Sequence, residues 1–337
     1  MAHTIDTELY RFTENEPHER GFAKVFDEEI LPVLKEAELT RRRMVFKLQK
    51  RLGIASVVVL AWLLGAELMW GVGAMPLATI VGLSGLAVAI MPAFRYQCFY
   101  KREVYPVVAR HLGLEYFPDG LNLLNMVDVK WTNRYISRLT FLRPHASGVL
   151  PFTIGLTGED GFKGTFNGIP LAFEEIHMLG DRSVDLTFGF RAIAVLVTLP
   201  AQLGNRVFVK ADRGFANWTH GKFPGMDTIR FDDDAFEEQY EVFAEDEAEA
   251  RALLTPEARR ILTEVAHLFG KSSIKLSFRG QEMFMVIPVR HNLFEVTTMF
   301  RSALLPGDIR LLLKKTAMLE QLVAALGRPQ STTAESA

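Results

Sequence analysis

Apolar positions along the chain fall into three successive patterns. Residues 22–48 repeat apolar side chains at helical spacing, with charged residues between them, and residues 52–94 are almost entirely apolar. From residue 113 onward, short alternating runs are separated by Gly, Pro and Asn. In order, these three patterns predict an amphipathic helix, a membrane-spanning helical segment and a series of β-strands. The predicted fold class is therefore an α+β membrane protein.

Residues 52–94 contain no Lys, Arg, Asp or His. One helix over this length would extend roughly 65 Å, about twice the hydrocarbon thickness of a bilayer. Gly71 and Pro76 lie where a turn would divide it, since glycine is flexible and proline lacks an amide donor. The sequence predicts a transmembrane hairpin of two helices, at about 52–70 and about 75–94.

Basic residues immediately before the first span set its predicted orientation. They are Arg41, Arg42, Arg43, Lys47, Lys50 and Arg51. Because Lys and Arg resist translocation, we expect both termini to be cytoplasmic. The same six side chains could bind anionic lipid headgroups, each contributing about 1 kcal/mol near the surface, although their role in topology explains them equally.

Glu67 is the one charged residue of the apolar segment. A carboxylate in a bilayer could serve a proton or ion relay, but a protonated or interface-reaching side chain is the favoured interpretation because the hairpin offers no titratable partner. The second span also carries small residues on one helical face: Ala78, Gly82, Gly85 and Ala89. They predict close packing within the hairpin, or alternatively between two copies of the chain.

Helices that flank the hairpin are expected to form a cytoplasmic stalk, so that residues 17–112 make one helical region. The two apolar stripes are Phe22, Phe26, Val33, Ala37, Met44 and Leu48 before the hairpin, and Phe94, Cys98, Val104, Tyr105, Val108 and Leu112 after it. Pro32 and Pro106 are expected to kink or break these helices. Cys98 is expected to be buried in the stalk. Residues 1–16 should be loosely ordered, and we expect no cleavable signal peptide in residues 1–40, which lack an apolar run.

Residues 113–327 predict a cytoplasmic α+β domain with a mostly antiparallel sheet, because strands come in succession and helices gather late. Gly158–Gly161 predicts a turn, and Asn167-Gly168 predicts a tight hairpin. Arg279 and Gly280 predict a second hairpin. Residues 328–337 are expected to be disordered.

The helices of this domain have clear start signals. A short helix is expected at 247–254, and Asp246 can cap it. A longer helix is expected from Pro256 to Phe269, with Thr255 as its N-cap. A last helix should begin near Asp308 and dock an apolar face on the sheet.

Composition excludes several classes of function. The net charge is -2, with 38 basic and 40 acidic side chains, so no basic field supports nucleic-acid binding. The single cysteine excludes an internal disulfide framework and a cysteine-rich zinc site. The histidines lack close ligand spacing, and no phosphate-binding or nucleophile motif is intact. We therefore expect no cofactor and no metal.

The run TIRFDDDAFEEQYEVFAEDEAEARALLTP resembles an uncharacterised bacterial membrane-protein family, a domain of unknown function preceded by a pair of membrane helices. The matching positions are Asp234, Phe236, Glu237, Tyr240, Val242, Asp246, Ala250, Arg251, Leu254, Thr255 and Pro256. Ala252 departs from the bulky aromatic expected there. The resemblance implies a multi-pass protein of the bacterial inner membrane and supplies no activity, catalytic residue or cofactor.

The sequence favours a membrane-tethered cytoplasmic binding or scaffold domain, with an unidentified protein partner or a second copy of the chain. The alternative is a membrane-anchored enzyme that uses a carboxylate and arginine cluster, whose candidate residues are Asp212, Arg213, Asp234, Glu237 and Arg251. A weaker alternative is a transport assembly of oligomerised hairpins. Asp232, Asp233 and Asp234 could bind a hard cation, but a solvated turn is favoured.

Overall fold

The computed structural model of the chain describes residues 10–70, 98–99, 101–121, 155–179, 190–211, 225–269, 274–289, 294 and 300–327. The side chains of 62–64, 66–70, 155–157, 178–179 and 190 are not described. The chain divides into two compact units. The first comprises Met1–His111 and Glu295–Leu311, and the second Leu112–Phe294 and Leu312–Ala337.

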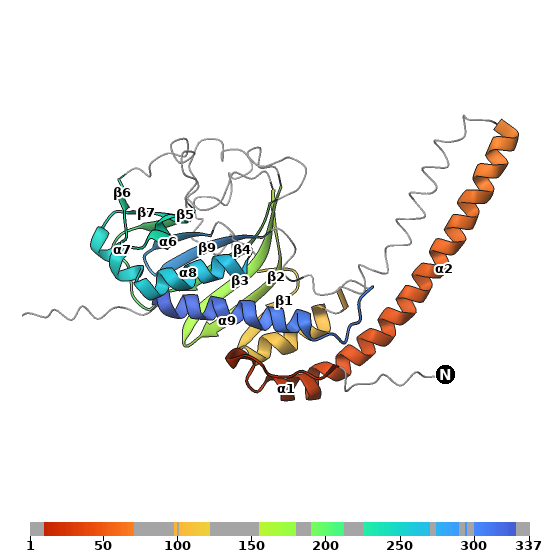
Figure 1. The fold of residues 1–337 in the computed structure, drawn as a ribbon, viewed down its shortest axis with the longest axis horizontal. Helices are drawn as coiled ribbons and strands as arrows, with labels where there is room; N and C mark the ends of the chain where they lie inside the picture. Colours follow the sequence, from red (N-terminus) through yellow and green to blue (C-terminus); the bar gives the residue numbers. More distant parts are fainter. Residues whose placement is uncertain are drawn as a thin grey trace, which may run out of the picture. The chain divides into compact units, whose positions relative to one another are not determined.

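The first unit is helical. A 3₁₀ turn at Pro17–Glu19 leads to α1 (Phe22–Val25), a π-helical turn at Phe26–Ile30 and the long helix α2 (Leu31–Trp70), shown in red and orange in Figure 1. Residues 101–111 are also helical. The long N-terminal helix is confirmed as far as Trp70.

The structure agrees with the prediction for Pro32 and corrects those for Pro106 and Cys98. Pro32 coincides with an irregularity, because the π-helical turn ends just before it, where the missing amide donor removes a hydrogen bond. Pro106, in contrast, lies inside helical residues 101–111 and does not break the helix there. Cys98 is exposed, so its predicted burial is wrong.

Aromatic and aliphatic side chains from three segments form the core of the first unit. Phe22 and Phe26 are fully buried, and so is Val104 of the later helix. The Phe22 ring contacts the His111 ring at a centroid distance of 4.9 Å. Phe12 is 4% exposed and packs on Phe22, so the loose order expected for residues 1–16 does not hold at that position.

A buried carboxylate, Glu38, joins α2 to a distant segment of the same unit. It accepts hydrogen bonds from Arg41 and Arg42 on its own helix and from the Ala303 amide at 3.0 Å. Burial alone would raise the pKa of this carboxyl, but these hydrogen bonds lower it from 4.5 to about 2. Glu38 is therefore ionised and stabilising at neutral pH.

Membrane-spanning helices were expected at about 52–70 and about 75–94. The described part of the chain contains no helix both long enough and apolar enough to cross a membrane. The first expected span falls at the end of α2, and the second lies outside the described residues.

In the second unit, the described residues form a nine-stranded sheet in which every pair is antiparallel. Its order is β1-β2-β3-β4-β9-β8-β5-β7-β6. The strands are β1 (Leu114–Phe117), β2 (Gly155–Phe166), β3 (Ile169–Leu179), β4 (Phe190–Thr198), β5 (Val207–Ala211), β6 (Asp227–Ile229), β7 (Tyr240–Ala244), β8 (Lys275–Arg279) and β9 (Glu282–Val289). The predicted α+β fold with an antiparallel sheet is confirmed.

The hairpin predictions are confirmed where the turn residues have the required backbone. Asn167 and Gly168 join β2 to β3 with φ of 49° and 82°, the left-handed values of a tight hairpin turn. Gly280, with φ of 61°, lies between β8 and β9. The turn predicted at Gly158–Gly161 is wrong, because these residues form a bulge inside β2.

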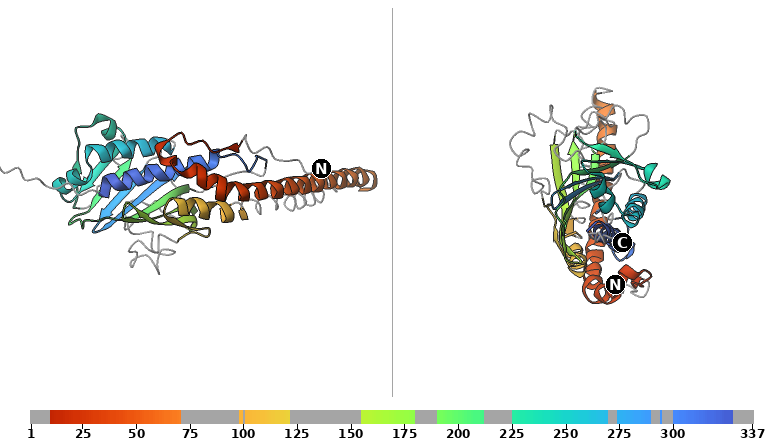
Figure 2. Two further views of the ribbon diagram at one scale, coloured as in Figure 1. Left: turned by 90° about the horizontal axis from the view of Figure 1, so that it is seen from below. Right: turned by 90° about the vertical axis from the view of Figure 1, so that its left-hand side faces the viewer.

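Helices of the second unit are α6 (Asp234–Glu237), α7 (Glu247–Leu253), α8 (Pro256–Leu268) and the part of α9 (Gly307–Gly327) from Leu312 onward. Figure 2 shows α8 and α9 on one face of the sheet. That face carries fully buried side chains such as Ile193 and Ile287. Thr255 caps α8 as predicted, accepting from the Ala258 amide at 3.1 Å.

Replacing Glu38 by Gln should lower the stability of the first unit at neutral pH, because the variant loses the three charge-assisted hydrogen bonds from Arg41 and Arg42. The pKa of Glu38 is depressed on folding, so its contribution is present above about pH 4.5 and is lost as the pH falls towards 2. Thermal unfolding of wild type and Glu38→Gln across this range should converge at the acid end. A pH-independent difference would contradict this role, and Glu36→Gln on an exposed position is the control.

Candidate functional site

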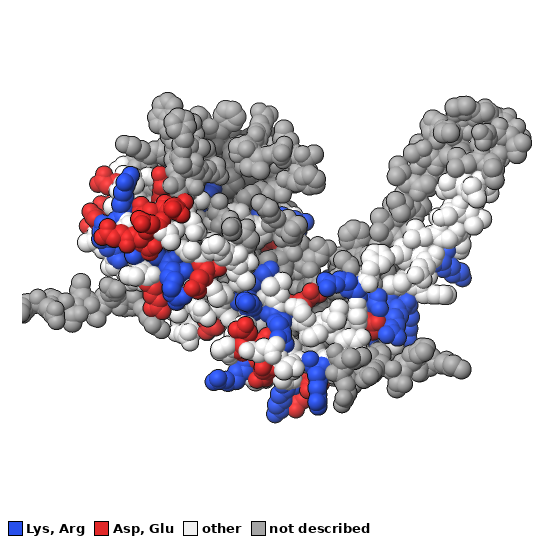
Figure 3. All heavy atoms as spheres, viewed as in Figure 1, with Lys and Arg blue, Asp and Glu red and all other residues white. Residues whose placement is uncertain are grey.

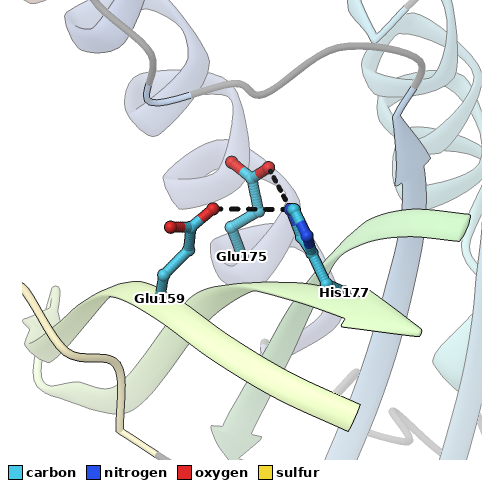
Figure 4. Close-up of side chains that lie close together, drawn as sticks. All are labelled: Glu159, Glu175 and His177. Carbon is cyan, nitrogen blue, oxygen red and sulfur yellow. Dashed lines mark ion pairs between the residues drawn. The ribbon is translucent and has the colours of Figure 1, made fainter. Parts of the chain in front are cut away.

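Three chemically versatile side chains gather on the second unit. Glu159 projects from β2, and Glu175 and His177 project from β3, so that they point toward one another (Figure 4). His177 Nε2 lies 3.4 Å from Glu159 Oε1 and 3.6 Å from Glu175 Oε1. One ligand atom from each residue can be chosen such that all three lie within 4.8 Å. We call this group the Glu–Glu–His cluster.

Strand geometry explains why these residues meet. Glu159 and Glu175 are register partners across the β2–β3 ladder, and His177 is two residues beyond Glu175 on the same face of β3. The register between the strands shifts just after Glu159, where Asp160 has a φ of 51°. Such a bulge re-aims side chains and is common beside functional sites.

Burial is graded across the cluster. Glu175 is completely buried, whereas His177 is 27% exposed and Glu159 is 39% exposed. The carboxylate of Glu175 also accepts a hydrogen bond at 3.2 Å from Arg191 Nη1 on β4. The cluster therefore has one dry side and one side open to solvent.

Besides Arg191, Lys315 of α9 interacts electrostatically with Glu175. Burial lowers the pKa of Lys315 to about 8, while the charge of Glu175 acts in the opposite direction. A lysine with a depressed pKa beside carboxylates and an imidazole is the type of environment found at functional sites, although structural networks produce it too.

The same hairpin holds two more buried carboxylates. Glu174 accepts a hydrogen bond at 2.6 Å from the Leu121 amide, and Asp160 accepts one from the Tyr116 hydroxyl. A Cβ at Gly158 would lie 2.6 Å from a Glu174 oxygen, so any larger residue there would force the Glu174 carboxylate to shift. Burial and the neighbouring Asp160 both raise the pKa of Tyr116, which keeps its hydroxyl protonated as the donor.

Of the residues proposed for an enzyme from the sequence, the three that the structure describes do not form a comparable group. Asp212 and Arg213 lie outside the described residues, and Asp234 is exposed. Glu237 accepts from the Phe231 amide at 2.8 Å, and Arg251 donates to the Arg230 carbonyl at 2.8 Å. These two side chains therefore hold one backbone segment from different elements.

Other members of the sequence motif have local structural contacts. Asp246 caps α7 by accepting from the Glu249 amide at 2.7 Å, Pro256 begins α8, and Phe236 is buried. Arg259, which the sequence analysis did not single out, bonds Asp233 at 3.0 Å and lies 4.7 Å from the Phe231 ring centroid. Figure 3 shows the acidic side chains of this region gathered over α6 and α7.

Among the residues expected at the membrane, Glu67 and the six basic residues that precede the first span are all on α2. Glu67 lies within the helix, but its side chain is not described. Arg41 and Arg42 form ion pairs with Glu38. The remaining four basic side chains are exposed: Arg43, Lys47, Lys50 and Arg51.

Sequence reasoning missed the Glu–Glu–His cluster. Metal-ligand motifs are recognised by close spacing along the chain. Glu159 does not fit such a motif, because a hairpin turn separates it from Glu175 and His177. The available signal was the pair Glu175 and His177 at strand spacing beside a strong hairpin turn, which brings β2 carboxylates across from them.

The C-terminal part of the chain is similar to a family of proteins of unknown function. A family model described as "Protein of unknown function (DUF3137)" matches residues 189–328, and no curated protein matches the sequence. The match supports an uncharacterised domain family over that part of the chain. A mycobacterial structure, that of trehalose monomycolate transport factor A, TtfA, is similar at 12% identity and a TM-score of 0.35. The alignment covers 68% of this chain and 94% of that one, and at this score it carries no conclusion.

Replacing Arg191 by Met should destabilise the second unit by about 1–3 kcal/mol, because a buried carboxylate loses a charged donor. The double variant Arg191→Met/Glu175→Gln should recover part of this loss, since the buried charge is removed as well. Denaturant unfolding of the full chain measures both effects.

The matched control is Arg260→Met, which removes an exposed ion pair with Glu264 and should change stability by less than about 0.5 kcal/mol. Equal effects of the two arginine variants would contradict the importance of Arg191.

Proposed function

We propose that this protein is anchored in a bacterial cytoplasmic membrane by residues 52–94, and that its α+β unit serves there as a cytoplasmic binding or scaffold domain. The observation that carries the proposal is the exposed apolar surface of α2 from Leu52 to Leu60. Support from the sequence comes from the continuation of the same apolar character to Phe94.

Several large apolar side chains of α2 are exposed to solvent. Their exposed fractions lie between 36% and 67% for Leu52, Ile54, Val57, Val58 and Leu60. Because they are distributed around the helix, one docking face on a protein could not cover them all. A helix that is apolar on every side is typical of a membrane or a protein interior. Complete transfer of one such side chain from water to an apolar environment is favourable by about 1.5–3 kcal/mol of free energy.

Charge along α2 is consistent with this proposal. The exposed basic residues Arg43, Lys47, Lys50 and Arg51 immediately precede the apolar part, and in Figure 3 their region adjoins an uncharged stretch of the helix. Basic residues at this position favour a cytoplasmic N-terminus and attract anionic headgroups. We assign lipid contact to these four residues, because Arg41 and Arg42 are held by Glu38.

A binding role is favoured over the proposed enzyme for a specific reason. The structure describes three of the catalytic candidates, Asp234, Glu237 and Arg251, and the last two are bonded to the Arg230–Phe231 backbone. A catalytic acid, base or anion-binding group must instead be available to a substrate. Their contacts stabilise the local fold on which a binding surface would depend.

Membrane insertion should require the apolar part of α2. The wild-type chain should remain in the membrane pellet after alkaline extraction of disrupted cells. Val57→Asp/Leu60→Asp should lose much of this association, since each Asp costs about 3 kcal/mol near the centre of a membrane helix. The control Val57→Ala/Leu60→Ala should behave as wild type. Recovery of the wild-type chain in the soluble fraction would contradict the proposal.

Topology provides a separate test. A tag at the C-terminus should resist protease added outside intact spheroplasts and should be digested after detergent lysis, because both termini are expected in the cytoplasm. A periplasmic protein with the same tag verifies that the protease is active. Digestion of the tag in intact spheroplasts would rule out this orientation while leaving membrane insertion itself supported.

A further inference from the structure

We infer that Glu159, Glu175 and His177 form a binding site for a divalent first-row transition-metal ion. Neither the sequence motifs nor the family comparison assigns such a site. The inference concerns the second unit alone, and it does not depend on attachment of the protein to a membrane.

Interatomic distances carry the inference. His177 Nε2 is 3.4 Å from Glu159 Oε1 and 3.6 Å from Glu175 Oε1, both longer than the usual 2.7–3.2 Å of N–H to oxygen hydrogen bonds. Two ligands that are each about 2.1 Å from one ion lie about 3.4 Å apart at the tetrahedral angle. The nitrogen is therefore spaced from both oxygens as metal ligands are spaced from each other.

The third separation and the burial of the ligands are compatible with ion entry. The three ligand atoms lie within 4.8 Å of one another, and the Glu159 side chain is sufficiently exposed to adjust. Glu175 and His177 both project from β3, which is paired with β2 on one side and β4 on the other, and this fixes their spacing. His177 Nε2 is itself buried, so an ion would enter the site from the exposed Glu159 side.

Arg191 is compatible with this site because it can support a ligand. Its Nη1 donates to Glu175 Oε1 at 3.2 Å, and a carboxylate oxygen has lone pairs for both a donor and an ion. Carboxylates that bind metals are commonly hydrogen-bonded in turn by a second group. The competing explanation is that Arg191 and His177 only neutralise a buried carboxylate, and the experiment below separates the two.

Ligand chemistry selects the class of ion. One imidazole and two carboxylates suit Zn²⁺, Mn²⁺, Fe²⁺ or Co²⁺. Mg²⁺ and Ca²⁺ prefer sites made of oxygen atoms alone. We therefore expect Zn²⁺ and Mn²⁺ to bind and Mg²⁺ to bind much more weakly.

The test uses the full chain, purified without a histidine tag and stripped of metal with a chelator. Isothermal titration with Zn²⁺ and with Mn²⁺ should show one saturable site. His177→Gln and Glu159→Gln should each weaken binding by at least about tenfold, since each removes one of three protein ligands. The matched controls, His267→Gln and Glu257→Gln, change exposed residues of α8 and should bind as wild type.

Two results would overturn the inference. One is the absence of saturable Zn²⁺ and Mn²⁺ binding by the wild-type chain, and the other is equal affinity in wild type, His177→Gln and Glu159→Gln. Circular dichroism of each variant verifies that it is folded. Glu159→Gln is the more secure variant in this respect, because Glu159 is the most exposed of the three side chains.

Discussion

Burial of carboxylates is the constraint on which both units depend. Among the described residues, five acidic side chains are almost completely inaccessible to solvent: Glu19, Glu38, Asp160, Glu174 and Glu175. An ionised carboxylate inside a protein needs donors or cations nearby, since the loss of hydration is otherwise too costly. Each of the five accordingly accepts from, or pairs with, another segment. Glu38 reaches Ala303, Glu174 reaches Leu121, and Glu19 lies 3.2 Å from Arg310. These contacts tie together parts of the chain that are remote in sequence.

Local sequence signals were sufficient for much of the fold. Asn167-Gly168 and Thr255-Pro256 were interpreted correctly because backbone sterics and helix capping act within a few residues. Gly158–Gly161 has the composition of a turn but forms a bulge, because β2 continues to pair with β3 on both sides of it. That outcome depends on a partner strand, and no local pattern contains it.

Prediction of the candidate site failed for a related physical reason. Glu159 becomes a neighbour of His177 only through the β2–β3 register and the shift beside the bulge. All three residues of the Glu–Glu–His cluster precede residue 189, where the matched family region begins, whereas Arg191 lies inside it. The cluster therefore combines residues outside the matched region with a supporting arginine within it.

Continuity of α2 has a mechanical consequence. The helix extends over 40 residues, or about 60 Å, and its described backbone contains no break between the Glu38 contacts and Trp70. If the apolar part of α2 tilts, the part that carries Glu38 must tilt with it. Glu38 is hydrogen-bonded to the Ala303 amide. The helix acts as a stiff rod, and a tilt of its apolar part loads the hydrogen bond from the Ala303 amide to the Glu38 carboxylate, which joins residues 265 apart in the chain.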